Sequence, residues 1–255
     1  QAHKRAMVFA AQQSAQQLPV HEYQLEAEIH HHFAMSGARH PAYGTIVGGG
    51  ENACILHYTE NDAQIDESAM VLIDAGCELQ GYAADITRTF PISGVFTPEQ
   101  KAIYQLVLKA QLSVLDQIKP GANLKSLTEH SVKVITQGLV ELGILKGEVD
   151  ELIKDSAHRA YYMHGLAHWL GLDVHDVGTY LPLKANSVIT VEPGIYIPAG
   201  SPCDKKWWNI GVRIEDDVLI TEGDPEVLSD CIPKTTEEIE ILMQQTSIFN
   251  KKWKT

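Results

Sequence analysis

The sequence has little positive charge, no long apolar run and no paired cysteines. Among its 255 residues, 20 Lys and Arg stand against 33 Asp and Glu, which gives a formal net charge of −13. Nucleic acids and anionic membranes repel such a chain unless its cations cluster, so we expect neither as a partner. No apolar segment approaches the roughly 18–20 residues that span a bilayer. The four cysteines are widely spaced, which disfavours a zinc ribbon or a disulfide framework and predicts a reducing, cytoplasmic setting.

The composition is that of an ordinary globular protein. Hydrophobic residues make up 44% of the chain and charged residues 21%, which excludes a disordered or a collagen-like chain. The chain opens on Gln1 without an initiator Met, and helix-like sequence begins almost at once. We therefore expect a piece of a longer protein.

Helical periodicity and β-like runs follow one another in two similar rounds. Apolar spacing predicts helices over residues 6–15, 22–35, 98–118, 124–142 and 236–244. The third begins with a capping box, in which Thr97 is the N-cap, Pro98 takes the first helical position and Gln100 follows. Short apolar runs predict strands over residues 43–47, 54–58, 69–75, 82–90, 161–166, 187–197 and 211–221. We expect the glycines at 48–50 to form a hairpin turn, because a phosphate loop would need GxxxxGK[ST].

The order of these elements indicates the fold class. Two helices and then strands, twice over, predict an α+β fold with an internal duplication. Helices and strands do not alternate one for one, so we expect a curved, mostly antiparallel sheet backed by helices and not a doubly wound parallel sheet.

Four acidic residues interrupt apolar, β-like sequence. Asp74 and Asp85 do so in the first half, and Glu192 and Glu215 in the second. A charge at such a position is costly unless it is paired or bound to a metal. Acids on four strands can converge only on the concave side of a curved sheet, where they would repel one another unless cations held them together.

Each of these residues also has a simpler interpretation. Asp74 alone could form an Asx turn, and Glu215 could pair with Arg213 at the surface. His168 alone could be a satisfied core histidine, and the histidines at 30–32 are expected on a partly solvated helix face. The combination of two Asp, two Glu and a His in apolar context favours a site.

A histidine-rich segment supplies a nitrogen ligand. It contains His164, His168 and His175, and it is not HExxH because Gly follows His164. One histidine among four carboxylates is an oxygen-rich set that suits Mn or Co, with Zn or Fe as alternatives.

Taken together, these motifs resemble the catalytic domain of the pita-bread metallopeptidases. Within that group they are most similar to the Xaa-Pro aminopeptidases (aminopeptidase P), with the prolidases next. The motifs are Asp74-Ala-Gly, Asp85-Ile-Thr-Arg-Thr-Phe-Pro, the segment from His164 to Asp176, Thr190-Val-Glu192-Pro-Gly, Arg213-Ile-Glu215-Asp and the stretch from Gly50 to Tyr58. The resemblance runs through almost the whole chain and implies one pita-bread catalytic domain over residues 1–255, with a pseudo-twofold duplication. Nothing in the chain corresponds to the upstream domain that precedes this unit in the Xaa-Pro group and contributes oligomer contacts, so a homo-oligomer of the full-length protein stays open.

The resemblance also implies a dinuclear site. Asp74 would chelate one divalent ion, His168 and Glu192 would bind the other, and Asp85 and Glu215 would bridge the two. The implied activity is hydrolysis of the Xaa-Pro bond at the N-terminus of peptides with proline at the second position, by a metal-bridging hydroxide and with Mn as the expected metal.

Further roles follow from the same resemblance. Glu192 would accept the proton, while His57 and His175 would hydrogen-bond the scissile carbonyl and the developing oxyanion. The other residues implied to line or orient the site are His164, Arg213 and Tyr196.

Two other functions remain open at this stage. A prolidase would be restricted to Xaa-Pro dipeptides. A metal-free binding module or hydrolase on the same scaffold would have lost ligands, whereas this sequence keeps all five. The loop at 203–208 carries Trp207 and Trp208, which we expect to pack on the upstream domain or to form part of the substrate rim.

Overall fold

A computed structural model describes residues 1–178 and 182–245 of the chain. The helices are α1 (Ala2–Ala15), α2 (Glu22–Met35), α3 (Pro98–Leu115), α4 (Leu124–Glu141), α5 (Val149–Lys154) and α6 (Thr236–Met243), with 3₁₀ turns η1 (Gly50–Cys54), η2 (Ala157–Ala160) and η3 (Lys205–Trp207). The strands are β1 (Val20–His21), β2 (His40–Pro41), β3 (Ile46–Gly49), β4 (Gln64–Ile65), β5 (Met70–Asp74), β6 (Cys77–Leu79), β7 (Tyr82–Ala83), β8 (Thr87–Pro91), β9 (Val188–Val191), β10 (Gly194–Ile197), β11 (Ile210–Arg213), β12 (Asp216–Leu219) and β13 (Glu226–Val227).

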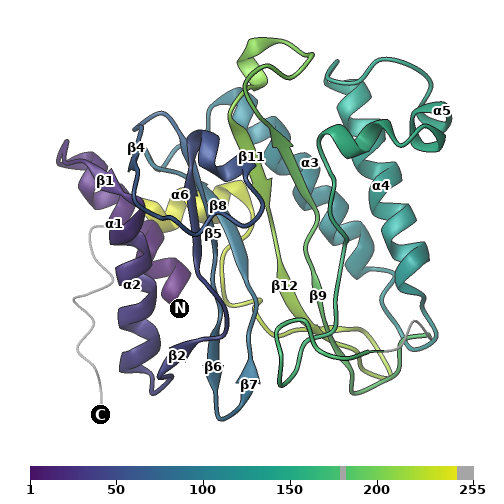
Figure 1. Cartoon of the computed structure of the whole chain (residues 1–255), viewed down its shortest axis with the longest axis horizontal. Helices are drawn as coiled ribbons and strands as arrows, with labels where there is room; N and C mark the ends of the chain where they lie inside the picture. Colours follow the sequence, from purple (N-terminus) through teal and green to yellow (C-terminus); the bar gives the residue numbers. More distant parts are fainter. Residues whose placement is uncertain (179–181, 246–255) are drawn as a thin grey trace.

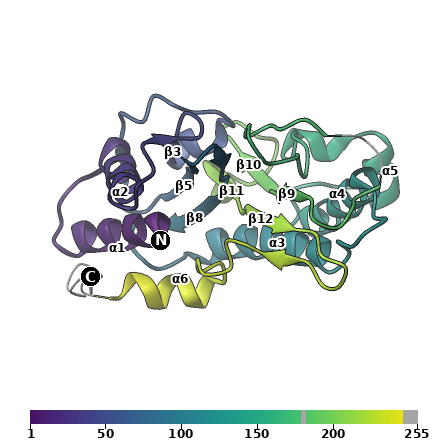
Figure 2. The ribbon, with the colours of Figure 1, turned by 90° about the horizontal axis from the view of Figure 1, so that it is seen from below.

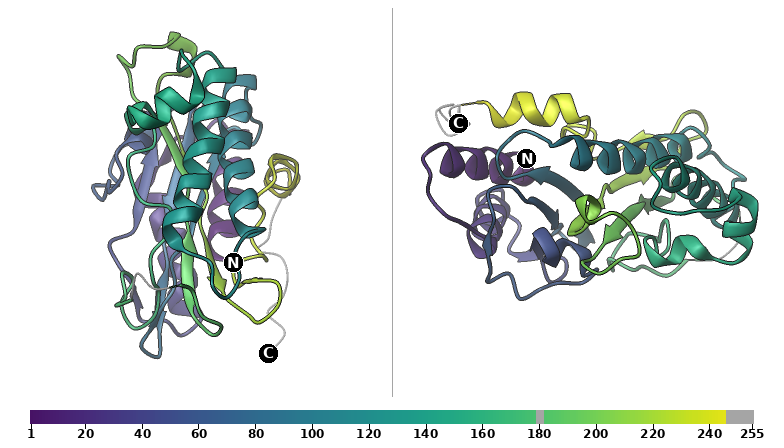
Figure 3. Two further views of the ribbon diagram at one scale, coloured as in Figure 1. Left: turned by 90° about the vertical axis from the view of Figure 1, so that its right-hand side faces the viewer. Right: turned by 90° about the horizontal axis from the view of Figure 1, so that it is seen from above.

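Every strand pairing in the described chain is antiparallel, which confirms the predicted α+β class. The first half pairs its strands in the order β3-β5-β8, and the second half in the orders β13-β12-β9 and β10-β11. Figure 1 shows β5 and β8 beside β11 and β12 at the centre of the molecule. Helices α1, α3 and α6 lie along one side of these strands (Figure 2, and Figure 3, right).

The predicted helices are confirmed with small shifts at their ends. The capping box of α3 is formed as expected: Thr97 Oγ1 accepts from the Gln100 amide at 3.2 Å, and the Gln100 side chain accepts from the Thr97 amide at 2.9 Å. The helix ends at Leu115, before the predicted 118, and α5 lies where only a charged connection was expected. These segments follow local rules of periodicity and capping, so the sequence alone locates them.

Several strand predictions are wrong. Residues 54–58 form the end of η1 and a turn, and residues 161–166 form no strand. The run at 82–90 divides into β7 and β8, the run at 187–197 divides at Pro193, and the run at 211–221 divides between Arg213 and Asp216. Each division lies at a predicted metal ligand. The acidic side chains at these breaks are not bound by the regular alternation of a strand.

The glycines at 48–50 do not form a hairpin turn. Gly48 and Gly49 belong to β3 and pair with Leu72 and Val71. A Cβ on Gly48 would lie 2.8 Å from the backbone of Asn52, and one on Gly49 would lie 2.7 Å from the Ile65 side chain. Glycine is needed here because backbone and side chains approach the strand closely.

The aromatic loop packs within this chain. Trp207 is only 6% exposed and belongs to the main hydrophobic core, against which Trp208 packs. The expectation that both tryptophans await an upstream domain or a substrate is therefore wrong for Trp207.

A buried ion pair joins the two halves. Arg88 of β8 is fully buried and binds Asp216 of β12 at 2.6 Å. The same guanidinium donates to the carbonyl of Glu215 at 2.7 Å and to those of Ile232 and Pro233. Burial would raise the pKa of Asp216, but the adjacent cations Arg88 and Lys234 lower it overall. One cation thus holds the backbone of a predicted ligand in place.

We predict that Arg88→Ala lowers the free energy of unfolding by about 3–5 kcal/mol, because it leaves Asp216 buried without its main partner. Denaturant titration monitored by circular dichroism measures the loss. Lys101→Ala is the control, since Lys101 pairs with Glu237 on the surface at 2.8 Å and its removal should leave the midpoint unchanged. Equal midpoints for all three proteins would contradict the role given to Arg88.

Candidate metal centre

The five predicted ligands face one cavity of about 280 Å³, from elements in both halves of the chain. Asp74 ends β5, Asp85 lies between β7 and β8, and Glu215 lies between β11 and β12. Glu192 follows β9, and His168 lies on the loop before it, where its amide donates to Thr190 Oγ1 at 3.1 Å. The predicted residues His57, His164, His175 and Arg213 also line this cavity.

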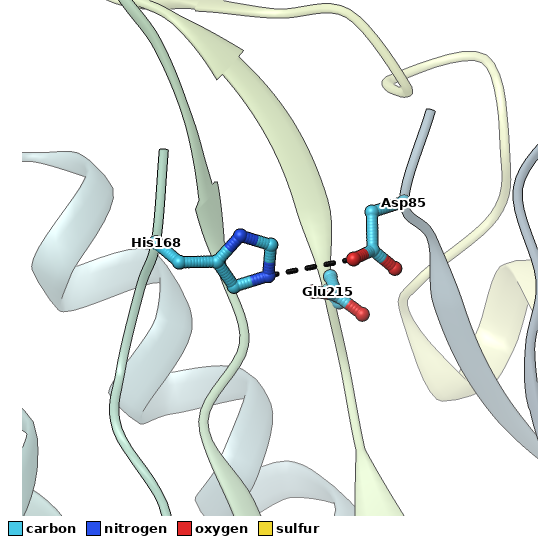
Figure 4. Close-up of side chains that lie close together, drawn as sticks. All are labelled: Asp85, His168 and Glu215. Carbon is cyan, nitrogen blue, oxygen red and sulfur yellow. Dashed lines mark ion pairs between the residues drawn. The ribbon is translucent and has the colours of Figure 1, made fainter. Parts of the chain in front are cut away.

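Three of the five side chains approach one another as a ligand set would. Suitable atoms of Asp85, His168 and Glu215 all lie within 4.8 Å of one another. His168 Nε2 is 3.4 Å from Asp85 Oδ2, and Figure 4 shows the imidazole directed at this carboxylate. The same nitrogen is 3.6 Å from Glu192 Oε1. His168 therefore contacts carboxylates of both halves, and its interpretation as a lone core histidine is wrong.

Asp74 is held by two neighbouring side chains. Arg213 donates to its Oδ2 at 2.7 Å, and the Tyr43 hydroxyl lies 2.5 Å from its Oδ1 and 2.6 Å from Asp85 Oδ1. Asp74 ends a strand and forms no Asx turn. The sequence motifs do not point to Tyr43, because nothing in Pro-Ala-Tyr-Gly distinguishes it from an ordinary loop residue.

Glu215 is a buried ligand candidate and not part of a surface pair. It is 1% exposed, and Thr87 Oγ1 donates to it at 2.6 Å. Arg213 is also buried and turns instead to Asp74, to Thr87 Oγ1 and to the hydroxyl of Tyr196. Thr87 lies inside the motif that begins at Asp85, yet the residue that its hydroxyl binds, Glu215, is 128 positions away in the sequence.

The remaining histidines stand around the carboxylates. His164 Nε2 lies 2.8 Å from the Tyr196 hydroxyl, and its Nδ1 lies 3.6 Å from Glu192 Oε2. The rings of His168 and His175 are 4.2 Å apart between centroids. These residues can donate hydrogen bonds toward a ligand that enters the cavity.

Comparison with known proteins decides the family. The family model described as metallopeptidase family M24 matches residues 1–222. The chain belongs to metallopeptidase family M24. It is 53% identical over 227 residues to the Xaa-Pro aminopeptidase of Escherichia coli, covering 87% of this chain and 52% of that protein. The Xaa-Pro aminopeptidase of Haemophilus influenzae is 52% identical over 227 residues, covering 87% of this chain and 53% of that protein.

Solved structures agree with this M24 assignment. A substrate complex of an E. coli aminopeptidase P variant superposes with a TM-score of 0.91 at 50% identity, covering 95% of this chain and 55% of that one. The Zn-substituted E. coli enzyme with product gives 0.91 at 51% identity, with the same coverage. The predicted pita-bread fold is thereby confirmed. The chain spans about half the length of these relatives. No helix in the described part of the chain is long and apolar enough to cross a membrane.

The electrostatics of the M24 cavity fit a cation site. Burial raises the pKa of Glu192 to about 7 against the opposing effect of Arg213, and burial beside Asp85 and Glu192 raises the pKa of Glu215 well above its ordinary value. Burial lowers the pKa of His168, but its bond to Asp85 and the nearby Glu192 outweigh this and raise it to about 8. Raised pKa values favour protonation of part of the cluster when no ion is bound, and this would relieve the repulsion between the carboxylates. Divalent cations would replace those protons, and oxygen with one imidazole is a donor set that such ions accept.

A further carboxylate supports the cluster. Both oxygens of Asp217 face the amide of Asp85, at 3.2 and 3.3 Å. Burial raises the pKa of Asp217 to about 8. In the sequence, Asp217 is only the second residue after Glu215, and nothing there indicates its bond to the Asp85 backbone.

We predict that the ion-free protein loses stability as the pH rises from 6.5 to 8. In the folded state the pKa is about 7 for Glu192 and about 8 for both Asp217 and His168, in each case above the ordinary value. In this pH window the folded protein therefore holds more protons on these groups than the unfolded chain does, so the free energy of unfolding falls as the pH rises. Thermal unfolding of chelator-treated protein measures the trend, and added Mn²⁺ should reduce it. A melting temperature that rises with pH over this window would contradict the interpretation.

Proposed function

We propose that this chain is the catalytic part of a dinuclear Xaa-Pro aminopeptidase. The observation that carries the proposal is the convergence of Asp85, His168 and Glu215 within 4.8 Å of one another, from both halves of an M24 fold. The relatives described above bear the aminopeptidase name, which favours this function over prolidase. All five expected ligands are present, which disfavours a metal-free binding module.

The proposed ligand assignment is the one that the resemblance to the pita-bread metallopeptidases implies. Asp74 would hold one ion, His168 and Glu192 the other, and Asp85 and Glu215 both. Mn²⁺ is the proposed metal, with Co, Zn or Fe as alternatives, because hard carboxylate ligands outnumber the single imidazole. When bound, two such ions supply an activated water near neutral pH and polarise the scissile carbonyl.

The protein's own residues would then handle protons and developing charge. Glu192 lines the cavity beside the other proposed ligands, and it would accept a proton from the activated water and pass it to the leaving nitrogen. His57 and His175 would donate hydrogen bonds to the carbonyl oxygen as it gains charge. Arg213 would orient Asp74, and Tyr196 would orient His164 through the 2.8 Å contact.

The wider context of the protein is part of the proposal. The substrates would be peptides with proline at the second position, and residues 1–255 would form one catalytic domain of a longer protein. Widely spaced free cysteines support the cytoplasmic setting.

We predict that the full-length gene product, loaded with Mn²⁺, releases glycine from Gly-Pro-Ala. A prolidase would cleave Gly-Pro and leave the tripeptide intact, so amino-acid analysis of both digests separates the two functions. The chelated enzyme serves as the control, and activity should return with Mn²⁺. No cleavage of either peptide by metal-loaded protein would refute the proposal.

We predict that Asp85→Ala and Glu215→Ala bind less metal than Asp74→Asn, because losing a shared ligand disturbs both ions. Elemental analysis after Mn²⁺ loading and desalting should find about two ions in the parent, about one in Asp74→Asn and fewer in the alanine variants. Circular dichroism checks that each variant is folded. Equal metal content in the parent and Asp85→Ala would show that Asp85 is no ligand.

A further inference from the structure

A buried carboxylate lies at the start of α2, outside the metal cavity. Glu22 is fully buried and accepts four hydrogen bonds. Its Oε1 accepts from the Gly49 amide at 2.8 Å and from Asn52 Nδ2 at 2.9 Å. Its Oε2 accepts from the Tyr58 hydroxyl at 2.8 Å and from the Ala63 amide at 2.9 Å. A carboxylate offers about four acceptor positions, so this one is filled entirely by neutral donors.

All four donors belong to the segment 49–63. Between Ile55 and Ala63 this segment has no helix or strand to fix its path. Irregular backbone of this kind depends on individual side-chain bonds for its conformation. Glu22 bonds the segment at its beginning, at its end and at Tyr58 between them.

The segment carries a residue of the proposed reaction. His57 is exposed and lines the metal cavity, whereas its neighbour Tyr58 is buried and turns toward Glu22. Because the two residues are adjacent in the chain, holding Tyr58 also restrains the backbone position from which the His57 side chain extends. Glu22 itself does not line the cavity in the described structure.

We propose that Glu22 is a positioning residue for His57, acting through the segment 49–63. This inference rests on the proposed function, in which His57 donates to the substrate carbonyl. A merely structural Glu22 would change stability and leave the turnover of folded, metal-loaded enzyme intact. A positioning Glu22 changes turnover only while His57 is present.

The test is a double-mutant cycle. Glu22→Gln keeps the size of the side chain but replaces one acceptor oxygen with an NH₂ group, which faces either the Gly49 and Asn52 donors or the Tyr58 and Ala63 donors. Tyr58→Phe removes a single bond. Each is measured with Mn²⁺ and Gly-Pro-Ala, alone and combined with His57→Ala. We expect Glu22→Gln to lower kcat about tenfold at unchanged metal content, and Tyr58→Phe to lower it less. In the His57→Ala background neither should lower it further.

The matched control is Glu28→Gln. Glu28 lies on the same helix and pairs with Arg5 at 2.9 Å, away from the segment, so kcat should not change. Equal losses from Glu22→Gln with and without His57, or a loss of melting temperature without a loss of kcat, would overturn the inference.

A second measurement does not depend on activity. In histidine-labelled protein, Glu22→Gln and Tyr58→Phe should shift and broaden the ring signals of His57, whereas Glu28→Gln should not. Unchanged His57 signals would overturn the inference even in an active enzyme. If the parent protein cleaves no peptide, the proposed function fails, and these signals alone decide whether Glu22 positions His57.

Discussion

The whole structure is constrained by four carboxylates, three buried and one (Glu192) partly exposed, that come from the two halves of the chain and share one cavity. Their mutual repulsion is partly offset by Arg213, which binds Asp74, and by the hydroxyls of Tyr43 and Thr87. These bonds leave an excess of negative charge, which protons or divalent cations would neutralise. The region where β8 meets β11 and β12 therefore lies at the centre of the fold and also lines part of the metal cavity.

The strands are interrupted where this chemistry is needed. Asp85, Glu192 and Glu215 each lie between two short strands, where a side chain is freed from strict alternation. Arg88 and Asp217 then bind the backbone beside two of these breaks. A preorganised ligand set requires this arrangement, in which the ligands lie on hydrogen-bonded backbone between two regular strands.

The sequence predicted the helices other than α5, and the five candidate ligands, because both depend on local signals. Periodicity and capping located α3, and acids in apolar runs identified Asp74 and Glu215. It did not predict Tyr43, Thr87 or Glu22 as functional, because the partners of these side chains lie 27 to 128 positions away in the sequence. The hairpin turn predicted at Gly48 was wrong for a similar reason. Glycines that allow Asn52 and Ile65 to approach a strand closely look, in the local sequence, like the glycines of a turn.

The most direct test of the central claim is a crystal structure of the Mn²⁺-loaded protein with anomalous scattering measured at the manganese edge. The account predicts two anomalous peaks in the cavity, both contacted by Asp85 and Glu215, with Asp74 on one side and His168 and Glu192 on the other. A single peak, or two peaks without a shared carboxylate, would contradict it.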